Sequence, residues 1–313
     1  MRSMGGRGRT PAYSDLPMPP FFWIPATVVA SIFQVARNGL QRSLAPRAGP
    51  WGATLVRFLF GLPFSLTFVA VARALTPDAH LNFTAAFWSA AAAGAVGQVL
   101  ATAALLTAMR RAGFAVGTAL QQSSLPLSAI IGLAVFHDVL SAQAWLGVAI
   151  TTAGLLALTW PKGASGPQPV SGALFGLVSG LCFGFSLNAF RHTGLALEPR
   201  HPVYSAIVGV AVVQALQASV LTLWLAICDP GSLRAVIVGW RESLGAGFCG
   251  ACASSAWFVA LALSPAAPVR AVGVIEAPIA ALAARRFFHE RLHVRQILAG
   301  AAVLVGVVLT ALR

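Results

Sequence analysis

Apolar segments of about 20 residues recur along most of the chain, separated by short stretches that carry charge, proline or glycine. A helix of that length crosses a bilayer core of roughly 30 Å. The runs are continuously apolar, which excludes the alternating strands of a membrane barrel, and backbone groups in lipid must be satisfied within the segment, so helices are predicted. The ten predicted spans lie near residues 21–40, 51–73, 85–109, 114–135, 141–160, 170–190, 202–227, 243–263, 267–288 and 293–312.

The composition agrees with a membrane protein. Hydrophobic residues make up 58% of the chain and charged residues only 9%, with a mean hydropathy of +0.79. A soluble domain carries roughly 25% charged residues, so a soluble enzyme, a disordered protein and a disulfide-rich scaffold are all disfavoured. The net charge of +13 would indicate nucleic acid in a soluble protein. Here the arginines fall mostly in tails and loops, so the predicted partner is the lipid bilayer and not nucleic acid.

The second half of the chain repeats the first at a distance of 152 positions. The matching pairs are Pro126/Pro278, Phe136/Phe288, His137/His289, Asp138/Glu290, Leu140/Leu292 and Gly154/Gly306. Two halves with five helices each enter the membrane from opposite sides because five is odd, so the predicted fold is an all-α membrane protein with an inverted repeat. The predicted parts are a disordered cytoplasmic tail over residues 1–20, a first repeat over 21–160, a linker over 161–169 and a second repeat over 170–313.

Short motifs in both halves resemble one family. They are Asp138-Val139-Leu140 and Glu290-Arg291-Leu292, which are similar to a Gly-Glu-Arg-Leu signature, the Arg57-Phe58 pair, and the mid-helix prolines Pro126 and Pro278. Each half therefore resembles an EamA domain of the drug/metabolite transporter superfamily, although His137 and His289 replace the usual glycine and Asp138 replaces glutamate. The resemblance implies ten helices, a central cavity lined mainly by helices 1, 3, 4, 6, 8 and 9, and transport of a small molecule, often export. It implies no particular substrate.

Glu276 is the strongest candidate for a functional residue. It lies well inside the predicted span 267–288, near the membrane midplane and two residues before Pro278. A carboxylate at that depth is costly unless it is paired or protonated, and such residues are usually functional. Glu276 is thus a candidate proton carrier or a partner for a cationic substrate group; the alternative is a protonated glutamate bonded to a neighbouring helix. Arg270 lies six residues earlier, about 240° around a regular helix, so no pair with Glu276 is expected.

The first two predicted spans also carry polar residues. Gln34, Arg37 and Asn38 follow at i, i+3 and i+4, which puts them on one helix face that should look into a cavity rather than lipid. Arg37 is therefore a candidate for substrate binding or gating. Arg57, near the start of the second span, is a weaker candidate for the same role. Both arginines also fit a structural role, either as a tie between helices or by reaching the interface.

Further candidates lie in the fourth, sixth and eighth predicted spans. Gln121 and Ser124 lie in span 114–135, and Ser124 is the repeat equivalent of Glu276, so these two positions should approach each other across the cavity. Asn188 and Trp257 would add an amide and an aromatic wall. For each of these residues a hydrogen bond between packed helices is the alternative.

His289-Glu290-Arg291-Leu292-His293 matches the H-E-x-x-H pattern of zinc hydrolases, in which two histidines one helical turn apart bind the metal. The first-half counterpart ends in Ser141 and lacks the second histidine. The motif also falls at a predicted break between helices, so the two imidazoles need not share a face. The match is therefore interpreted as a coincidence of the Glu-Arg-Leu turn, and neither a metal nor another cofactor is predicted.

The sequence as a whole predicts a secondary transporter, not an enzyme, that moves a small polar or amphipathic metabolite by alternating access. Export follows from the resemblance. The absence of a Walker motif leaves an ion gradient, with protons as a candidate, or the substrate's own gradient to drive transport. The alternatives are a drug or cation exporter of the same fold and an intramembrane zinc hydrolase that uses His289 and His293. The predicted location is a bacterial inner membrane, and the arginine-rich tail favours cytoplasmic termini.

Overall fold

The structure, a computed structural model, describes residues 21–112, 117, 120–159, 169–276, 279, 302, 305, 306 and 308–310. Within these residues the regular structure is helical and no strand occurs. The helices are α1 (Trp23–Leu59), α2 (Leu62–Leu75), α3 (Ala85–Ala112), α5 (Ser124–Phe136), α6 (Ala142–Thr159), α7 (Pro169–Leu197), α8 (Pro202–Cys228), α9 (Pro230–Val238), α10 (Trp240–Leu263) and α11 (Ala266–Gly273).

Several helices are long and apolar enough to cross a membrane. Among the described residues there are five such stretches: Ser43–Leu75, Ala85–Ala112, Val170–Leu197, Pro202–Cys228 and Trp240–Leu263. Their outward faces are also apolar, since Leu174 of α7 and Val220 of α8 are 60% and 67% exposed. Exposed apolar surface spread over several helices is what a lipid environment requires and what a soluble protein avoids. The chain is therefore a multi-pass, all-α membrane protein.

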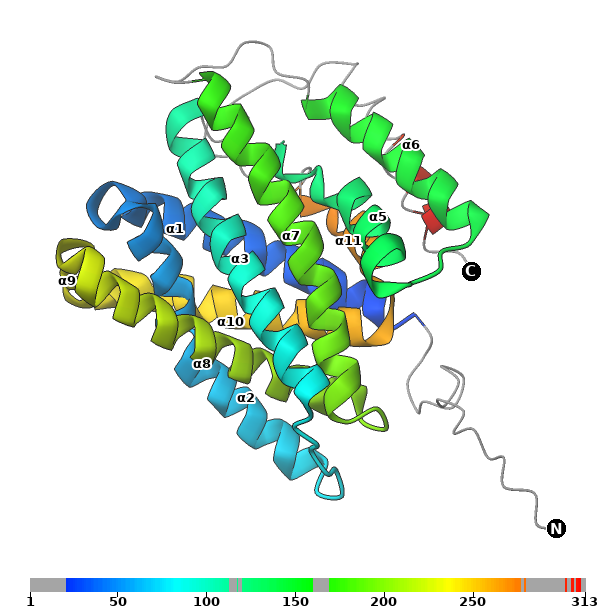
Figure 1. Ribbon diagram of the computed structural model, residues 1–313, viewed down its shortest axis with the longest axis horizontal. Helices are drawn as coiled ribbons and strands as arrows, with labels where there is room; N and C mark the ends of the chain where they lie inside the picture. The colour runs from blue at the N-terminus through cyan, green and yellow to red at the C-terminus, as the bar shows by residue number, and fades with distance from the viewer. Residues whose placement is uncertain are drawn as a thin grey trace.

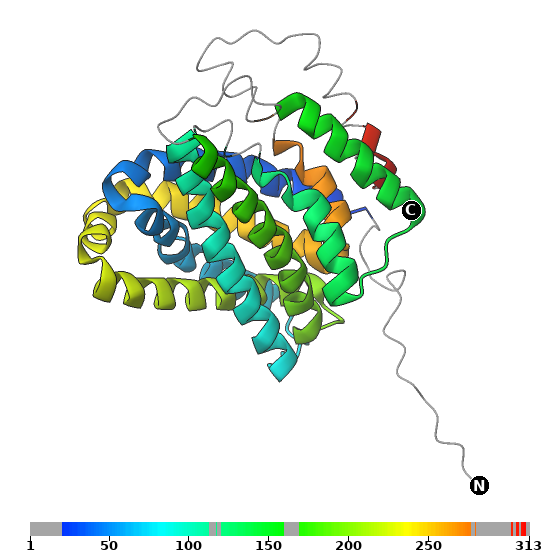
Figure 2. The ribbon, with the colours of Figure 1, turned by 45° about the horizontal axis from the view of Figure 1, so that its top comes forward.

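Two closely packed helix pairs form the centre of the bundle (Figures 1 and 2). α3 lies along α7, and α1 lies along α10 behind them. Small residues permit the close approach: a methyl group on Gly94 of α3 would lie 2.5 Å from Cε1 of Phe190 in α7. Helices in lipid gain their association mainly from such close packing and from interhelical hydrogen bonds. The crossing of the two pairs places α1, α3, α7 and α10 around one interior region.

The first two predicted spans are joined differently from the prediction. The stretch Arg42–Pro50 was predicted as a separator; helical structure extends through most of it, but two helices meet there at a kink, and the second of them ends at Leu59. The change of direction occurs at Gly49, whose φ of 64° and ψ of 175° suit only glycine. The predicted span 51–73 is therefore divided between the end of α1 and α2.

The separator Asp229–Trp240 is also partly helical: it contains α9, whose first turn is capped by Asp229 accepting from the Ser232 backbone N–H at 3.1 Å. Hydrogen bonds from Ser232 hold the pKa of the Asp229 carboxyl below its usual value.

The fourth and ninth predicted spans are interrupted, although each was predicted as one continuous helix. The first break is a turn at Gln122–Ser123, just before α5; the second is a turn at Val274–Ile275, just after α11. Pro126 explains the first break, because it has no N–H to donate to the carbonyl of Gln122. That carbonyl instead accepts from the N–H of Leu125 at 3.0 Å, an i→i−3 bond that tightens the turn.

The two breaks have matching backbone hydrogen bonds. At the first break the N–H of residue 123 donates to the carbonyl of residue 120, and that of residue 127 to residue 123. At the second break residue 275 donates to 272 and residue 279 to 275, each 152 positions later. The lengths are 3.1 and 3.2 Å in the first case and 3.1 Å for both bonds in the second. The backbone thus follows the same irregular path at two places in the chain.

The described part of the region after residue 300 packs against α6. A methyl group on Gly306 would lie 2.5 Å from the backbone nitrogen of Thr151, and one on Gly147 would lie 2.6 Å from that of Thr310. Gly147 and Gly306 therefore bring the two backbones into contact, as small residues do in membrane helix pairs.

The contact between α10 and the end of α1 gives a stability prediction. A methyl group on Gly247 would lie 2.5 Å from the carbonyl carbon of Phe60, a backbone atom that cannot move aside freely. Gly247→Ala is expected to lower the free energy of unfolding by about 1–3 kcal/mol through overpacking. Gly39→Ala is the matched control, since a methyl at Gly39 meets nothing within 4 Å. Thermal unfolding of both variants in detergent tests this, and equal midpoints would contradict it.

Candidate functional site

A buried ion pair joins Arg270, in α11, to Glu276, just beyond the break that follows α11. Nη1 of Arg270 lies 3.0 Å from Oε1 of Glu276, and the two side chains are 3% and 5% exposed. The expectation that these residues cannot pair was wrong. It assumed a regular helix, whereas Val274 and Ile275 donate to the carbonyls three residues earlier. Such bonds approach three residues per turn, so residues six apart come towards the same face.

Arg270 also binds the fourth predicted span. Its Nε donates to Oγ of Ser124 at 2.8 Å, and its Nη2 donates to Oε1 of Gln122. Its guanidinium lies 5.8 Å from the ring centroid of Trp257. All three nitrogens of Arg270 therefore have polar partners, which is what a buried guanidinium needs to offset its loss of hydration.

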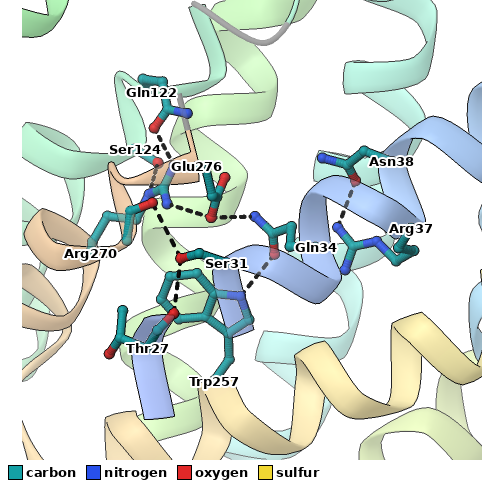
Figure 3. A network of polar contacts seen from close by, with 11 residues as sticks. Thr27, Ser31, Gln34, Arg37, Asn38, Gln122, Ser124, Trp257, Arg270 and Glu276 are labelled. Carbon is teal, nitrogen blue, oxygen red and sulfur yellow. Dashed lines mark hydrogen bonds and ion pairs between the residues drawn. The ribbon is translucent and has the colours of Figure 1, made fainter. Parts of the chain in front are cut away.

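Gln34 connects Glu276 to α10. Its Nε2 donates to Oε1 of Glu276 at 2.7 Å, and its Oε1 accepts from Nε1 of Trp257 at 2.8 Å. Both ends of the amide are thus used in the orientation that the partners require. Gly273 packs directly against the Trp257 ring and leaves no room there for a side chain. Figure 3 shows these side chains converging from α1, α10, the start of α5 and the end of α11.

We call Gln34, Gln122, Ser124, Trp257, Arg270 and Glu276 the ion-pair network. One oxygen of the network, Oε1 of Glu276, accepts hydrogen bonds from both Arg270 and Gln34. A connected polar network inside an apolar bundle holds its members in one arrangement, because each broken bond leaves a buried polar group unpaired.

A small cavity borders the network. It has room for about one or two waters, with roughly 20 Å³ for their centres. Its walls come from α1, α3, the start of α5, α7, α10 and α11, which correspond to predicted spans 1, 3, 4, 6, 8 and 9. The lining residues are Gln34, Gln98, Gln121, Ser124, Phe183, Leu187, Phe190, Ser254, Trp257, Phe258 and Arg270. The lining thus mixes amides and hydroxyls with aromatic rings, a combination that suits polar and amphipathic molecules.

The structure brings together some of the predicted site residues. Glu276, Gln34, Ser124 and Trp257 belong to the ion-pair network, and Gln121 lines the cavity. The expected approach of positions 124 and 276 takes place through Arg270, which bonds to both.

Other predicted site residues lie apart from this network. Asn188 donates to the backbone carbonyls of Ser128 and Gly184, each at 2.9 Å, and so ties α7 to α5. Arg37 donates to Oδ1 of the adjacent Asn38 at 2.8 Å, and neither lines the cavity (Figure 3). Arg57 donates hydrogen bonds to Oγ1 of Thr102 and Oγ of Ser254, each at 3.2 Å.

Sequence reasoning missed Arg270 and Gln122 as site residues. Arg270 lies near the start of the predicted span 267–288 and was considered only as a partner for Glu276. The available signal was Pro278, which made a regular helix between positions 270 and 276 doubtful. Gln122 lies on the turn before α5, where the same doubt applied because of Pro126.

The residues of the zinc alternative, His289 to His293, lie outside the described residues. Within the described residues no group of three His, Cys, Asp or Glu side chains is placed to hold a metal ion.

No family model matches the chain, and no curated protein is similar to it in sequence. A solved structure described only as "Crystal structure of protein" is similar in fold, with a TM-score of 0.63 and 18% sequence identity. The match covers 91% of this chain and 95% of the other. At that identity the likeness concerns the fold alone. Fold and site together define a polytopic helical membrane protein with a charged, hydrogen-bonded interior.

Proposed function

We propose that the chain is a secondary transporter of the EamA type that moves a small polar or amphipathic metabolite by alternating access. The observation that carries the proposal is the ion-pair network beside a cavity to which six helices contribute lining residues. Charged groups inside a membrane bundle are costly to keep and mark substrate or ion pathways. A scaffold without a transport role would have little need of the Arg270–Glu276 pair, because replacing a buried ion pair by apolar residues of similar volume is often neutral or stabilising.

The proposed architecture is two inverted five-helix repeats with ten spans. The interrupted spans support it, since both breaks have the same hydrogen bonds at a distance of 152 positions. The helix pairs support it too: α1 and α3 in the first half correspond to α7 and α10 in the second, so the α1–α10 and α3–α7 pairs exchange under the repeat. Repeats of this kind bind their substrates at broken helices near the repeat interface.

The proposed direction of transport, the membrane and the orientation of the termini follow from the sequence. Export, the bacterial inner membrane and cytoplasmic termini are the choices that the EamA resemblance and the arginine-rich tail favour. A cation exporter in which Glu276 binds the drug directly is less favoured, because Arg270 already neutralises that carboxylate. The mixed polar and aromatic lining has the chemistry for a metabolite with one polar and one apolar end, which the cavity would have to widen to admit during the transport cycle.

Uptake into proteoliposomes tests the proposal. Purified protein is reconstituted, and a panel of labelled acidic, neutral, zwitterionic and basic metabolites is assayed for counterflow with and without a pH gradient. At least one compound is expected to move faster than in protein-free vesicles. Absence of flux for every compound, with the protein folded and inserted, would refute the transport function.

Gln34→Leu is expected to lower the flux of the transported compound about 10-fold, because the loss of two hydrogen bonds to buried groups costs roughly 1–3 kcal/mol. Gln143→Leu is the matched control, since Gln143 is exposed on α6 and belongs to neither the network nor the cavity. Equal flux in the two variants would show that transport does not depend on the hydrogen bonds of Gln34 in the ion-pair network.

A further inference from the structure

Arg37 and Arg57 form a second buried cluster in α1, which we call the arginine pair. Each is only 1% exposed. Both pack on the same glycine of α10: a methyl group on Gly250 would lie 3.3 Å from Cβ of Arg57 and 3.5 Å from Cδ of Arg37. The stems of the two arginine side chains therefore pack on the same part of α10 inside the bundle, where like charges repel and hydration is lost.

The partners of the arginine pair are neutral. Arg37 donates to Asn38, and Arg57 donates to Thr102 and Ser254. Within the described residues no carboxylate lies at ion-pair distance from either side chain. The Nε atoms of both arginines are buried and have no hydrogen-bond partner there. A buried cation that lacks both a counter-ion and part of its hydrogen bonding is expensive, so an anionic partner is to be expected.

The charge balance points the same way. Among the described charged side chains that are at most 5% exposed there are three arginines, Arg37, Arg57 and Arg270, and one carboxylate, Glu276. The charge of Glu276 acts on Arg37, but its close contacts are with Arg270 and Gln34. Two positive charges in this part of the interior are therefore left uncompensated.

The arginine pair adjoins the cavity through its partners. Ser254 accepts from Arg57 and lines the cavity. Thr102 accepts from Arg57 and donates to the carbonyl of Gln98, another lining residue. Gln34 lines the cavity one helical turn before Arg37. Arg57 therefore lies directly behind the lining residue Ser254, although neither arginine lines the cavity itself.

We propose that the arginine pair binds an oxyanion, so that the substrate of the carrier is a small organic anion with a carboxylate or phosphate group. This inference rests on the transport function proposed above. The planar guanidinium edge with its free Nε–H matches the two oxygens of either group, and two arginines supply the charge for a dianion or for two such groups. The aromatic residues Phe183, Phe190 and Trp257 would contact the apolar part of the molecule.

Thermal unfolding of the purified full-length protein tests oxyanion binding without any need for transport. Sodium phosphate and sodium succinate are compared with sodium chloride at equal ionic strength. Ligand that binds only the folded state stabilises it by RT ln(1 + L/Kd) at a free ligand concentration L, so the unfolding midpoint rises with ligand concentration. Phosphate, succinate or both are expected to raise the midpoint above that in chloride. If neither does so, the inference is overturned.

The variants Arg37→Gln and Arg57→Gln are each expected to weaken the oxyanion affinity about 10- to 100-fold, the loss typical of a charged hydrogen bond. Arg47→Gln is the control: it removes the same charge from the same helix, but its side chain is 74% exposed. If the glutamine variants do not fold, Arg37→Lys and Arg57→Lys keep the charge, lose the planar fork and are expected to weaken binding at least 10-fold. A purely structural role would lower every midpoint and leave the oxyanion shift unchanged, which would overturn the inference.

Counterflow separates this inference from the proposed function. If carboxylates or phosphates are transported and the variants Arg37→Gln and Arg57→Gln abolish their flux, both the transporter and the oxyanion site are supported. Flux of neutral or basic compounds only, unaffected by these variants, supports the transporter and refutes the oxyanion site. Oxyanion binding that depends on the arginine pair, with no flux of any compound, supports the site and refutes the transporter.

Discussion

Replacing Arg270 by glutamine is expected to lower the free energy of unfolding by about 3–5 kcal/mol. The change removes the only cation at ion-pair distance from Glu276 within the described residues and leaves a carboxylate that is 5% exposed. A buried charge without its partner is among the most costly defects that a single substitution produces. Reversible unfolding in mixed micelles, followed by circular dichroism, measures the loss.

A second substitution distinguishes the pair from its separate members. The double variant Arg270→Gln/Glu276→Gln is expected to regain most of the lost stability, because both charges are gone and amides can replace their hydrogen bonds. Arg47→Gln is the control for charge removal, since the Arg47–Glu242 pair is exposed and such pairs contribute about 0–1 kcal/mol. An equal loss in Arg270→Gln and Arg47→Gln would show that the buried pair has no special weight.

Glu276→Gln is expected to reduce exchange in proteoliposomes at least 100-fold and to remove any dependence on a pH gradient. The substitution keeps an acceptor for Gln34 but leaves no group that can change charge at the break after α11. Transport that requires this carboxylate to exchange a partner or a proton during the cycle cannot proceed with an amide.

The control for this experiment is Glu242→Gln, which makes the same chemical change at a side chain that is 60% exposed. Its exchange rate is expected to match that of the unaltered protein. Unchanged exchange in Glu276→Gln, with the protein correctly folded, would sink the idea that the carboxylate takes part in transport. The pair with Arg270 would then serve the packing of the bundle alone.

The sequence predicts the helical membrane class and several helix boundaries well. α3, α6 and α8 begin and end within a few residues of the predicted spans 85–109, 141–160 and 202–227. The reason is physical: in lipid, length and apolarity decide whether a segment is a helix, so a simple hydropathy pattern is sufficient. The pattern does not reveal how consecutive helices join: within the predicted separator Arg42–Pro50 the two helices of α1 meet at the kink at Gly49.

The candidate site was predicted only in part, because its geometry depends on departures from a regular helix. Glu276, Ser124 and Gln34 were found from their chemistry and depth. Their connection was not, because six residues of regular helix would hold Arg270 and Glu276 on different faces. Two i→i−3 hydrogen bonds change that relation, and only the later proline at position 278 hinted at them.

The first span shows a second limit of sequence reasoning. Gln34, Arg37 and Asn38 were predicted to share a face that looks into one cavity. Gln34 does line the cavity, but Arg37 turns to Asn38 and packs on Gly250 of α10. A long arginine side chain can reach several neighbours from one helix position, so spacing along the helix does not fix what its guanidinium contacts.

The ion-pair network also has a consequence for how the chain is made. Arg270 and Ser124 are 146 residues apart, and Gln34 and Glu276 are 242 apart, so ribosomal synthesis delivers the partners of Arg270 and Glu276 long before the two charges themselves. A lone charge at the centre of a segment costs roughly 2.5–3.5 kcal/mol when the translocon releases it into lipid. Because Arg270 and Glu276 neutralise each other within six residues, the nascent segment can carry both into the bilayer as a neutral unit and acquire its distant partners afterwards.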